Sequence, residues 1–241
     1  MTDSSPQTGA VTIEIHNLTK RYNTQPVLNN LSLTIANGEF CVLVGANGAG
    51  KTTLLRILAT LIRPDSGEVQ INGIPISSDP TLRQKIGYLG HQSLFYGDLN
   101  ARENLLHYTR LYQLPNSEET IRQSIEAAGL TLQQHKPLRT YSRGMQQRLA
   151  IERSLIHNPA LLLLDEPYTG LDQEAAEGLD ERLGRLSMQG CTLLIVAHRP
   201  QRLLKTASHI AWLRDGRIHQ KTPVGQLFKN PDLDRYIREV K

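Results

Sequence analysis

The segment Gly45-Ala46-Asn47-Gly48-Ala49-Gly50-Lys51-Thr52 constrains the fold of this chain more than any other. It follows an unbroken apolar run, Phe40 to Val44, and it opens a stretch with leucines at helical spacing, Thr52 to Ile62. Glycines in such a loop let backbone N–H groups close around phosphate oxygens, while the lysine adds a positive charge and the threonine hydroxyl can bind Mg²⁺. The sequence therefore predicts a strand, a phosphate-binding loop and a helix in succession.

The ends of two later apolar runs carry side chains suited to chemistry on a bound phosphate. Asp165 and Glu166 follow the run Leu161 to Leu164, and His198 follows the run Leu193 to Ala197. In a parallel sheet these strand ends lie at the same edge as the phosphate loop. We expect Asp165 to hold Mg²⁺, Glu166 to act as the general base that activates water, and His198 to contact the terminal phosphate of ATP.

The order of the glycines indicates which nucleotide the loop takes. Gly45, Gly48 and Gly50 follow the pattern Gly-x-x-Gly-x-Gly, whereas dinucleotide folds use Gly-x-Gly-x-x-Gly, so NAD is disfavoured. ATP with Mg²⁺ is the expected ligand. A nucleotide kinase would use the same loop, but the adjacent acids Asp165 and Glu166 favour water as the acceptor of the phosphoryl group.

The rest of the chain divides into strand-like and helix-like parts. Alternating apolar residues near Val11 to Ile15 and Leu31 to Ile35 predict antiparallel strands, and the helix-like stretch Gln173 to Leu186 between two apolar runs predicts a parallel βαβ core. Capping residues and helix breakers predict three further helices. These helices and their caps are Ala101 to Leu114 after Asn100, Glu118 to Ala128 after Ser117, and Gln146 to His157 after Ser142.

We expect one domain over residues 11–241, preceded by a flexible leader over Met1 to Ala10. A β and phosphate-loop core should comprise residues 11–95 and 158–216, with a helical subdomain at about 96–157 and a basic segment at 217–241. From Arg199 to Lys241, ten Lys or Arg against four Asp or Glu leave a surplus of six positive charges. That surplus fits either an acidic partner, a membrane surface or a solvated face.

Two features of the composition limit where the chain works. Its longest apolar runs, Ala160 to Leu164 and Cys191 to Ala197, are far shorter than the roughly 20 residues that span a bilayer. We therefore expect a cytoplasmic protein that reaches a membrane only through a partner, and no nucleic-acid partner. Cys41 and Cys191 lie in separate apolar runs, which favours reduced thiols in the core over a disulfide or metal site.

Together these motifs resemble the nucleotide-binding subunit of ATP-binding cassette (ABC) transporters, from about Val11 to Gly216. The resemblance implies an α/β fold of the ABC type: a P-loop NTPase with a RecA-like core, an N-terminal antiparallel β subdomain and a helical signature subdomain. The matching positions are Tyr22 as the aromatic that stacks on adenine, the phosphate loop extended to Thr53, Gln92 as the Q-loop glutamine, Ser142 to Gln147 as the signature, Leu161 to Glu166 as Walker B, Thr169 to Asp172 as the D-loop, and His198 as the switch histidine.

The resemblance also implies a head-to-tail dimer, expected to be a homodimer, docked on a polytopic membrane permease at the cytoplasmic face of the inner (plasma) membrane. In such a dimer Ser142 and Gly144 of one chain close over ATP held by the other, Asp172 lies nearby, and Thr52, Gln92 and Asp165 hold Mg²⁺. The signature departs from the usual Leu-Ser-Gly-Gly-Gln at three positions. These are Tyr141, Arg143 and Met145.

Within the family, the signature and the segment from Asp165 to Asp172 look like those of exporters. Gly90-His91-Gln92 followed by Leu99 to Leu105 is similar to the ATPase of the haem exporter used in cytochrome c maturation, so the expected function is ATP hydrolysis coupled to haem export. Another ABC-2-type exporter ATPase and a soluble ABC ATPase of a cofactor-assembly complex stay open. Phe95 and Tyr96 follow the Q-loop, where family members receive a coupling helix, and are expected either to anchor that interface or to pack in the core.

Overall fold

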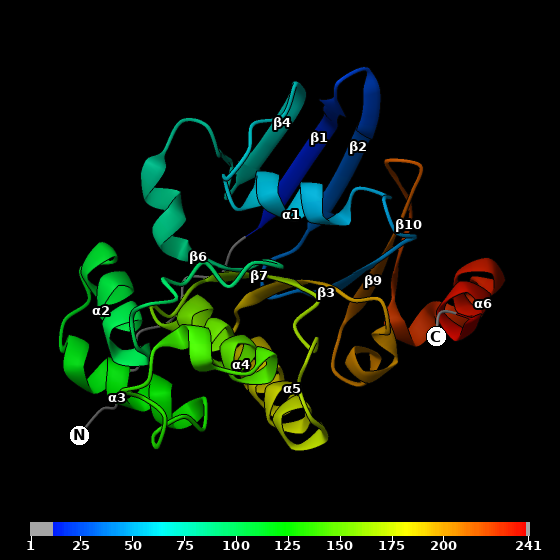
Figure 1. Ribbon diagram of the computed structural model, residues 1–241. Helices are drawn as coiled ribbons and strands as arrows, with labels where there is room; N and C mark the ends of the chain where they lie inside the picture. The colour runs from blue at the N-terminus through cyan, green and yellow to red at the C-terminus, as the bar shows by residue number, and fades with distance from the viewer. Residues whose placement is uncertain (1–11, 240–241) are drawn as a thin grey trace, which may run out of the picture.

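Two β-sheets and a group of helices make up the computed structural model, which describes residues 12–239 (Figure 1). The predictions for the leader Met1 to Ala10 and for Val11 lie outside these residues. Within them, no helix is long and apolar enough to cross a membrane.

The first sheet is antiparallel, as the alternating residues predict, and its strands lie in the order β2-β1-β4-β5. Ile13 faces Ile35, and Ile15 faces Leu33, across β1 and β2, and all four side chains are buried. The alternation thus follows from one face of the sheet covering the core. The strands are β1 (Ile13–Tyr22), β2 (Gln25–Ile35), β4 (Ser66–Ile71) and β5 (Ile74–Pro75).

The second sheet has six strands in the order β10-β9-β3-β8-β7-β6, parallel except for the β9–β10 pair. Val196 at the end of β8 faces Leu43 of β3 on one side and Asp165 of β7 on the other. The register therefore brings the phosphate loop, the acidic pair and the switch histidine to one edge. The strands are β3 (Phe40–Val44), β6 (Ile86–Leu89), β7 (Leu161–Asp165), β8 (Thr192–Val196), β9 (His209–Arg214) and β10 (Arg217–Pro223).

Helices cover both faces of this sheet, so its central strands read as unbroken apolar runs. Helix α1 (Lys51–Leu58) lies between the two sheets, and its leucines join a hydrophobic cluster with strands of both. On the other face, α4 (Arg143–Leu155) and α5 (Gln173–Met188) pack in a second cluster (Figure 1). The 3₁₀ helix η1 (Pro80–Lys85) leads into β6.

The helical subdomain holds α2 (Ala101–Leu111), α3 (Ser117–Ala127), the short η2 (Leu138–Thr140) and the start of α4. Asn100 caps α2 in a reciprocal capping box with Glu103, as the sequence predicts. The predicted Ser117 cap is wrong. Asn116, in the left-handed conformation at φ 52°, precedes α3, and the Ser117 hydroxyl instead donates back to the Leu114 carbonyl.

Several predicted helix ends also differ from the structure. Thr60 at φ 59° and Gln113 at φ 53° turn the chain left-handed, so α1 and α2 end before the last leucines of their periodic patterns. The signature helix begins at Arg143, directly after its cap Ser142, rather than at Gln146. Apolar spacing marks the face of a helix that is buried, and the turn chemistry after it decides where it ends.

The C-terminal residues complete the core. β10 pairs with β9, and the chain continues through η4 (Val224–Lys229) into α6 (Pro231–Glu239). Leu233 and Ile237 of α6 are buried in the same cluster as Leu203, which lies on η3 (Pro200–Lys205) after the switch histidine. Cys41 and Cys191 are free and buried, as predicted, and burial raises the pKa of both thiols.

Candidate nucleotide-binding and hydrolysis site

The glycine-rich loop between β3 and α1 packs against Val27 and Leu28 on one side, at Gly50, and is open on the other side, at Gly48. Gly50 has φ 105°, and a Cβ there would lie 2.7 Å from a methyl carbon of Leu28 and 2.8 Å from the Val27 carbonyl oxygen. Gly48, at φ 79°, has nothing within 4 Å of where its Cβ would be. Because α1 starts without a side-chain cap, its first N–H groups are available to an anion on the open side.

Lys51 is buried, with 7% of its surface exposed. Its ammonium donates to the carbonyl oxygens of Gly45 at 2.6 Å and Ala46 at 2.9 Å, so it lies across the loop. Burial lowers the pKa of Lys51, and the nearby carboxylates of Glu166 and Asp165 oppose that shift. A phosphate entering the loop would meet a cation that the loop already holds in place.

Asp165 has the features of a cation ligand. Its Oδ2 accepts a 2.7 Å hydrogen bond from the Thr52 hydroxyl, while its buried Oδ1 has no hydrogen-bond partner. No group of three His, Cys, Asp or Glu residues within 12–239 could hold a metal ion. A metal at Asp165 would take its other ligands from groups such as the Thr52 hydroxyl and the oxygens of a phosphate, which is how Mg²⁺ binds in nucleotide sites. The unpartnered carboxylate oxygen beside the Thr52 hydroxyl fits Mg²⁺.

Glu166 is held in an unusual backbone conformation at the end of β7. Its φ is 53°, and its N–H donates to the Val196 carbonyl at 3.0 Å. The buried Oε1 has no hydrogen bond and lies 3.5 Å from Nε2 of His198. Burial raises the pKa of the Glu166 carboxyl, and His198 acts in the opposite direction. A carboxylate with a raised pKa and a free oxygen beside a phosphate loop can accept a proton from water.

A cavity of about 220 Å³ joins these groups. It is lined by the phosphate loop, both acids and the switch histidine, so the structure brings together the predicted catalytic residues. The lining residues are Asn47, Gly48, Gly50, Lys51, Thr52, Thr53, His91, Asp165, Glu166, Val196 and His198.

His91 is the titratable member of this site that the sequence did not predict. Its Nε2 lies 3.4 Å from Oδ2 of Asp165. The only signal was its position beside Gln92 just after β6, at the sheet edge where β3, β7 and β8 also end. Gln92 itself lines a neighbouring cavity of about 500 Å³ that also touches Asp165 and Glu166.

Other predicted nucleotide-binding residues lie outside the 220 Å³ cavity of the chain as described over residues 12–239. Tyr22, at the end of β1, is 47% exposed. Ser142 accepts from the Met145 N–H at 3.2 Å and so caps α4, while Asp172 caps α5 through the Ala175 N–H at 2.8 Å. Gly144 packs on the D-loop, because a Cβ there would lie 2.6 Å from the Gly170 carbonyl oxygen.

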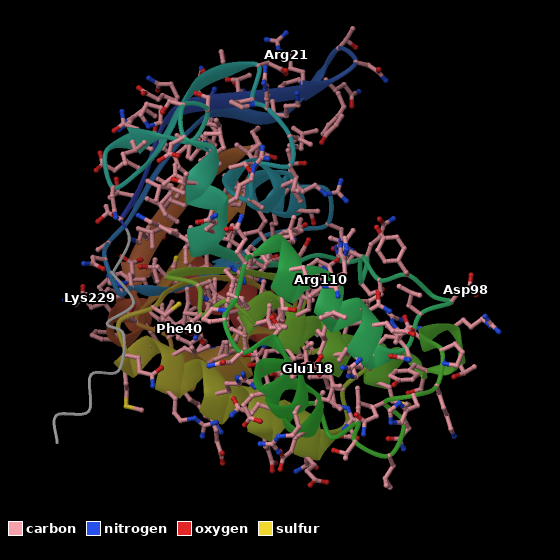
Figure 2. All side chains as sticks on the ribbon, turned by 90° about the vertical axis from the view of Figure 1, so that its left-hand side faces the viewer. Arg21, Phe40, Asp98, Arg110, Glu118 and Lys229 are labelled. Carbon is pink, nitrogen blue, oxygen red and sulfur yellow. The ribbon has the colours of Figure 1, made fainter. Side chains whose placement is uncertain are left out.

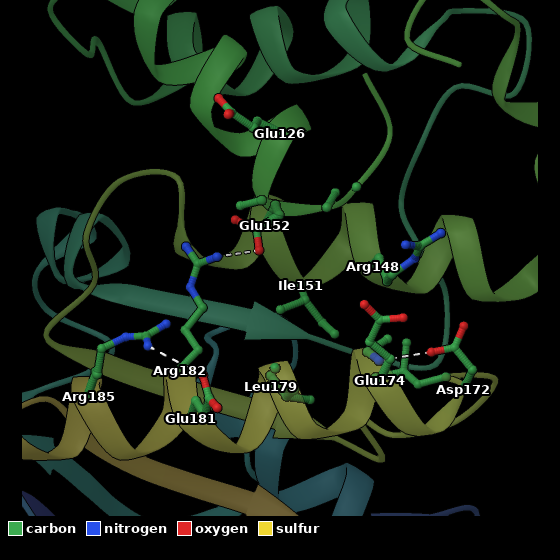
Figure 3. Close-up of a pocket in the computed structure, with 16 residues that line it drawn as sticks. Glu126, Arg148, Ile151, Glu152, Asp172, Glu174, Leu179, Glu181, Arg182 and Arg185 are labelled. Atoms are coloured by element: carbon green, nitrogen blue, oxygen red, sulfur yellow. Dashed lines mark hydrogen bonds and ion pairs between the residues drawn. The ribbon is translucent and has the colours of Figure 1, made fainter. Parts of the chain in front are cut away.

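A larger cavity of about 510 Å³ lies between α3, α4 and α5, away from the phosphate loop (Figure 3). Charged side chains of both signs line it. The buried Glu152 of α4 pairs across it with Arg182 of α5. This ion pair ties the signature helix to a helix of the core.

The comparisons with known proteins agree with this geometry. The ABC transporter family model matches residues 28–169. An uncharacterised ABC transporter ATP-binding protein, YcbN of Bacillus subtilis, is 36% identical over 86% of this chain and 67% of its own length. The Nod factor export ATP-binding protein I of Rhizobium meliloti is 38% identical over 78% of this chain and 57% of its own length. The chain thus spans about three fifths to two thirds of these relatives.

Solved structures share the fold over nearly their whole length. An ATP-binding subunit of an ABC transporter has a TM-score of 0.86 and 26% identity, covering 95% of this chain and 98% of that one. The dimeric cassette MJ0796, in a post-hydrolysis state with ADP and Pi, has a TM-score of 0.81 and 29% identity over 88% of this chain and 98% of its own. The chain therefore belongs to the ABC transporter family, as an ATP-binding and ATP-hydrolysing cassette.

Proposed function

We propose that this cassette hydrolyses ATP in a head-to-tail homodimer and that each ATP is enclosed by the phosphate loop of one chain and the signature of the other. One observation carries the proposal: the cavity at the phosphate loop contains Lys51, Thr52, Asp165, Glu166 and His198 but no signature residue among those described. One chain therefore supplies half of a closed site. The dimeric cassette among the similar structures supports assembly into a dimer.

The proposed roles follow from charge and position. Lys51 and the N–H groups of the loop bind the phosphates, and Thr52, Asp165 and Gln92 would hold Mg²⁺, which supplies positive charge against the phosphate oxygens. Glu166 takes the proton of the attacking water, because burial raises its pKa toward that of a useful base. His198, 3.5 Å from Glu166, orients the carboxylate and contacts the terminal phosphate.

The substitution Glu166→Gln tests the hydrolytic role. It removes the base while keeping the size of the side chain, so turnover should fall by roughly 10²–10⁴-fold, with ATP affinity retained. Phosphate release and nucleotide binding are measured on the same protein. Glu68→Gln, on an exposed position of β4, is the control and should match the wild type. Unchanged turnover in Glu166→Gln would remove Glu166 from the mechanism.

We infer that a membrane permease docks beside the Q-loop and keeps the cassette at the cytoplasmic face of the membrane. Leu94, Tyr96 and Leu99 leave 48%, 56% and 37% of their surfaces exposed there. Tyr96 is fixed by the buried Asn104, whose side chain accepts from the Tyr96 N–H at 2.9 Å and donates to its carbonyl at 3.1 Å. Figure 2 shows this side of the molecule, with Asp98 at its outer edge. An apolar patch on a rigid base suits an inserted helix.

The sequence left two roles open for Phe95 and Tyr96, packing in the core and anchoring the interface, and we assign one role to each residue. Phe95 is half-buried against two hydrophobic clusters and meets Tyr108 edge-on at 6.5 Å, so its role is packing. Tyr96 is the proposed anchor. Tyr96→Ala should abolish co-purification of the cassette with a polytopic membrane protein in detergent, while Met188→Ala, 82% exposed on α5, should not. Recovery of soluble partners alone would favour a cofactor-assembly ATPase instead.

The proposed substrate is haem, for cytochrome c maturation, and this rests on the resemblance around Gly90-His91-Gln92. Several relatives are named for other substrates, among them Nod factor and, for the bacitracin transport protein BcrA of Bacillus licheniformis, bacitracin. Another ABC-2-type exporter is the competing assignment. The detergent complex, isolated from cells that make haem, should carry haem absorbance, and a complex free of haem with ATPase activity would favour that competitor.

A further inference from the structure

Three side chains outside the catalytic cavity form a closed triangle. The Tyr168 hydroxyl donates to Oδ1 of Asp180 at 2.6 Å, and the Arg202 guanidinium donates to Oδ2 of the same carboxylate at 2.6 Å. The guanidinium carbon also lies 5.8 Å from the centre of the Tyr168 ring. Each carboxylate oxygen of Asp180 therefore accepts one hydrogen bond, and the two donors also contact each other.

The three residues come from three different elements. Asp180 lies in the middle of α5, whose Leu179 and Leu183 are buried in the core. Tyr168 lies two residues after Glu166, on the loop that leads to the D-loop. Arg202 lies four residues after His198, on η3, where Leu203 is buried beside it. The carboxylate of Asp180, on helix α5, thus binds both of the loops that carry the proposed catalytic pair, Glu166 and His198.

The catalytic pair needs such support. The His198 side chain is 47% exposed, and its Nε2 lies 3.5 Å from Oε1 of Glu166, a distance that depends on where the two loops lie. The backbone bond from Glu166 N–H to the Val196 carbonyl joins the loops at their base. The contacts of Asp180 with Tyr168 and Arg202 join the two loops a second time, further along the chain. Glu166 and His198 therefore lie between two cross-links.

We propose that Asp180 is a positioning residue for hydrolysis, which binds Tyr168 and Arg202 together and thereby fixes the relative placement of Glu166 and His198. The proposal rests on the hydrolytic roles proposed above for these two residues. Asp180 does not line the 220 Å³ cavity at the phosphate loop. Its charge pairs with Arg202, and its oxygen orders the phenol, so an amide at this position keeps the shape but weakens the cross-link.

Steady-state ATP hydrolysis by Asp180→Asn and Tyr168→Phe tests the proposal. Displacing a catalytic pair lowers the rate of the chemical step more than binding, so kcat should fall on the order of 10-fold while KM for ATP stays within about 2-fold. Tyr168→Phe removes only the hydroxyl and keeps the ring in place, so it serves if Asp180→Asn folds poorly. Glu181→Gln, beside Asp180 on α5, and Lys205→Gln, on η3, are the matched controls.

A double-mutant cycle separates positioning from a structural role. In a His198→Ala background the pair no longer exists, so adding Asp180→Asn should lower kcat little further. Loss of thermal stability with kcat unchanged in both Asp180→Asn and Tyr168→Phe would overturn the proposal, and so would a full, additive loss in the His198→Ala background. Glu166→Gln is assayed in parallel: if it keeps full activity, the proposed hydrolytic mechanism itself fails, whatever the Asp180 variants do.

Discussion

At the residue scale, the sequence points to candidate site residues most clearly where residue type alone decides the chemistry. Glycine at position 50 and the acids at the end of β7 could be assigned because few other residues can bind a phosphate or accept a proton there. The left-handed backbone of Glu166 could not be predicted, because it depends on a hydrogen bond to Val196, 30 residues further along the chain. His91 was missed because a single histidine after a strand has no distinguishing pattern.

His157 should make the stability of the protein depend on pH. Its ring stacks on Tyr112 at 3.9 Å, its Nε2 lies 3.1 Å from the Ile86 carbonyl, and burial lowers its pKa from 6.5 to about 4. Between these values the unfolded chain binds a proton that the folded chain does not, so stability falls as pH decreases from 6.5 toward 4.

Urea unfolding at several pH values between 7 and 4.5 measures this dependence. His157→Gln should flatten the part of the slope that lies in that window, and His135→Gln, at an exposed position, should leave the slope as in the wild type. If His157→Gln and the wild type lost stability in parallel as the pH fell, His157 would not be the titrating group.

At the element scale, the order and type of the main strands and helices follow from hydrophobic periodicity and caps. The sequence did not predict β4, β5, β6, β9, β10 or α6, and two of these, β4 and β9, are internal strands of their sheets. β6 has four residues, one of them Gly87, whose missing side chain lets the Ser154 carbonyl approach; a Cβ there would lie 2.3 Å from that oxygen. Such close packing is a tertiary contact with α4, and nothing in the local sequence signals it.

The link between α4 and α5 should contribute measurably to stability. Arg182→Gln leaves the carboxylate of Glu152, buried on α4, without its cationic partner, whereas Arg185→Gln breaks only the exposed i,i+4 contact with Glu181 at 3.8 Å. The first change should lower the free energy of unfolding by about 2 kcal/mol and the second by less than about 0.5 kcal/mol. Urea denaturation of both variants checks this difference, and equal effects would show that the buried pair adds nothing beyond a surface contact.

At the scale of the whole molecule, the basic C-terminal segment, counted here from Arg199, packs into the fold rather than forming an appendage. Lys221 on β10 pairs with the buried Glu39 at 2.7 Å, and Arg202 pairs with Asp180. Further pairs lie within the segment, at Arg214, Arg235 and Arg238. Much of the positive charge that the sequence concentrates after residue 198 therefore serves intramolecular contacts. Charge counting alone could not reveal the pairs of Lys221 and Arg202, because their partners Glu39 and Asp180 are distant in sequence.

The central claim is that one chain holds half of each hydrolytic site. Lys51→Ala disables the phosphate loop and leaves the signature intact. Ser142→Asp should disable the signature, because it places a negative charge where we propose that a phosphate binds, and Asp still caps α4. In a mixed head-to-tail dimer of these two variants, one of the two sites combines an intact loop with an intact signature.

Steady-state ATP hydrolysis by the two variants, alone and mixed in equal amounts, tests this claim directly. Each variant alone should be inactive. Random pairing makes half of the dimers mixed, with one intact site in two, so the mixture should recover about one quarter of the wild-type rate. A mixture as inactive as either variant would contradict the shared site and would show that the loop and signature of the same chain act together.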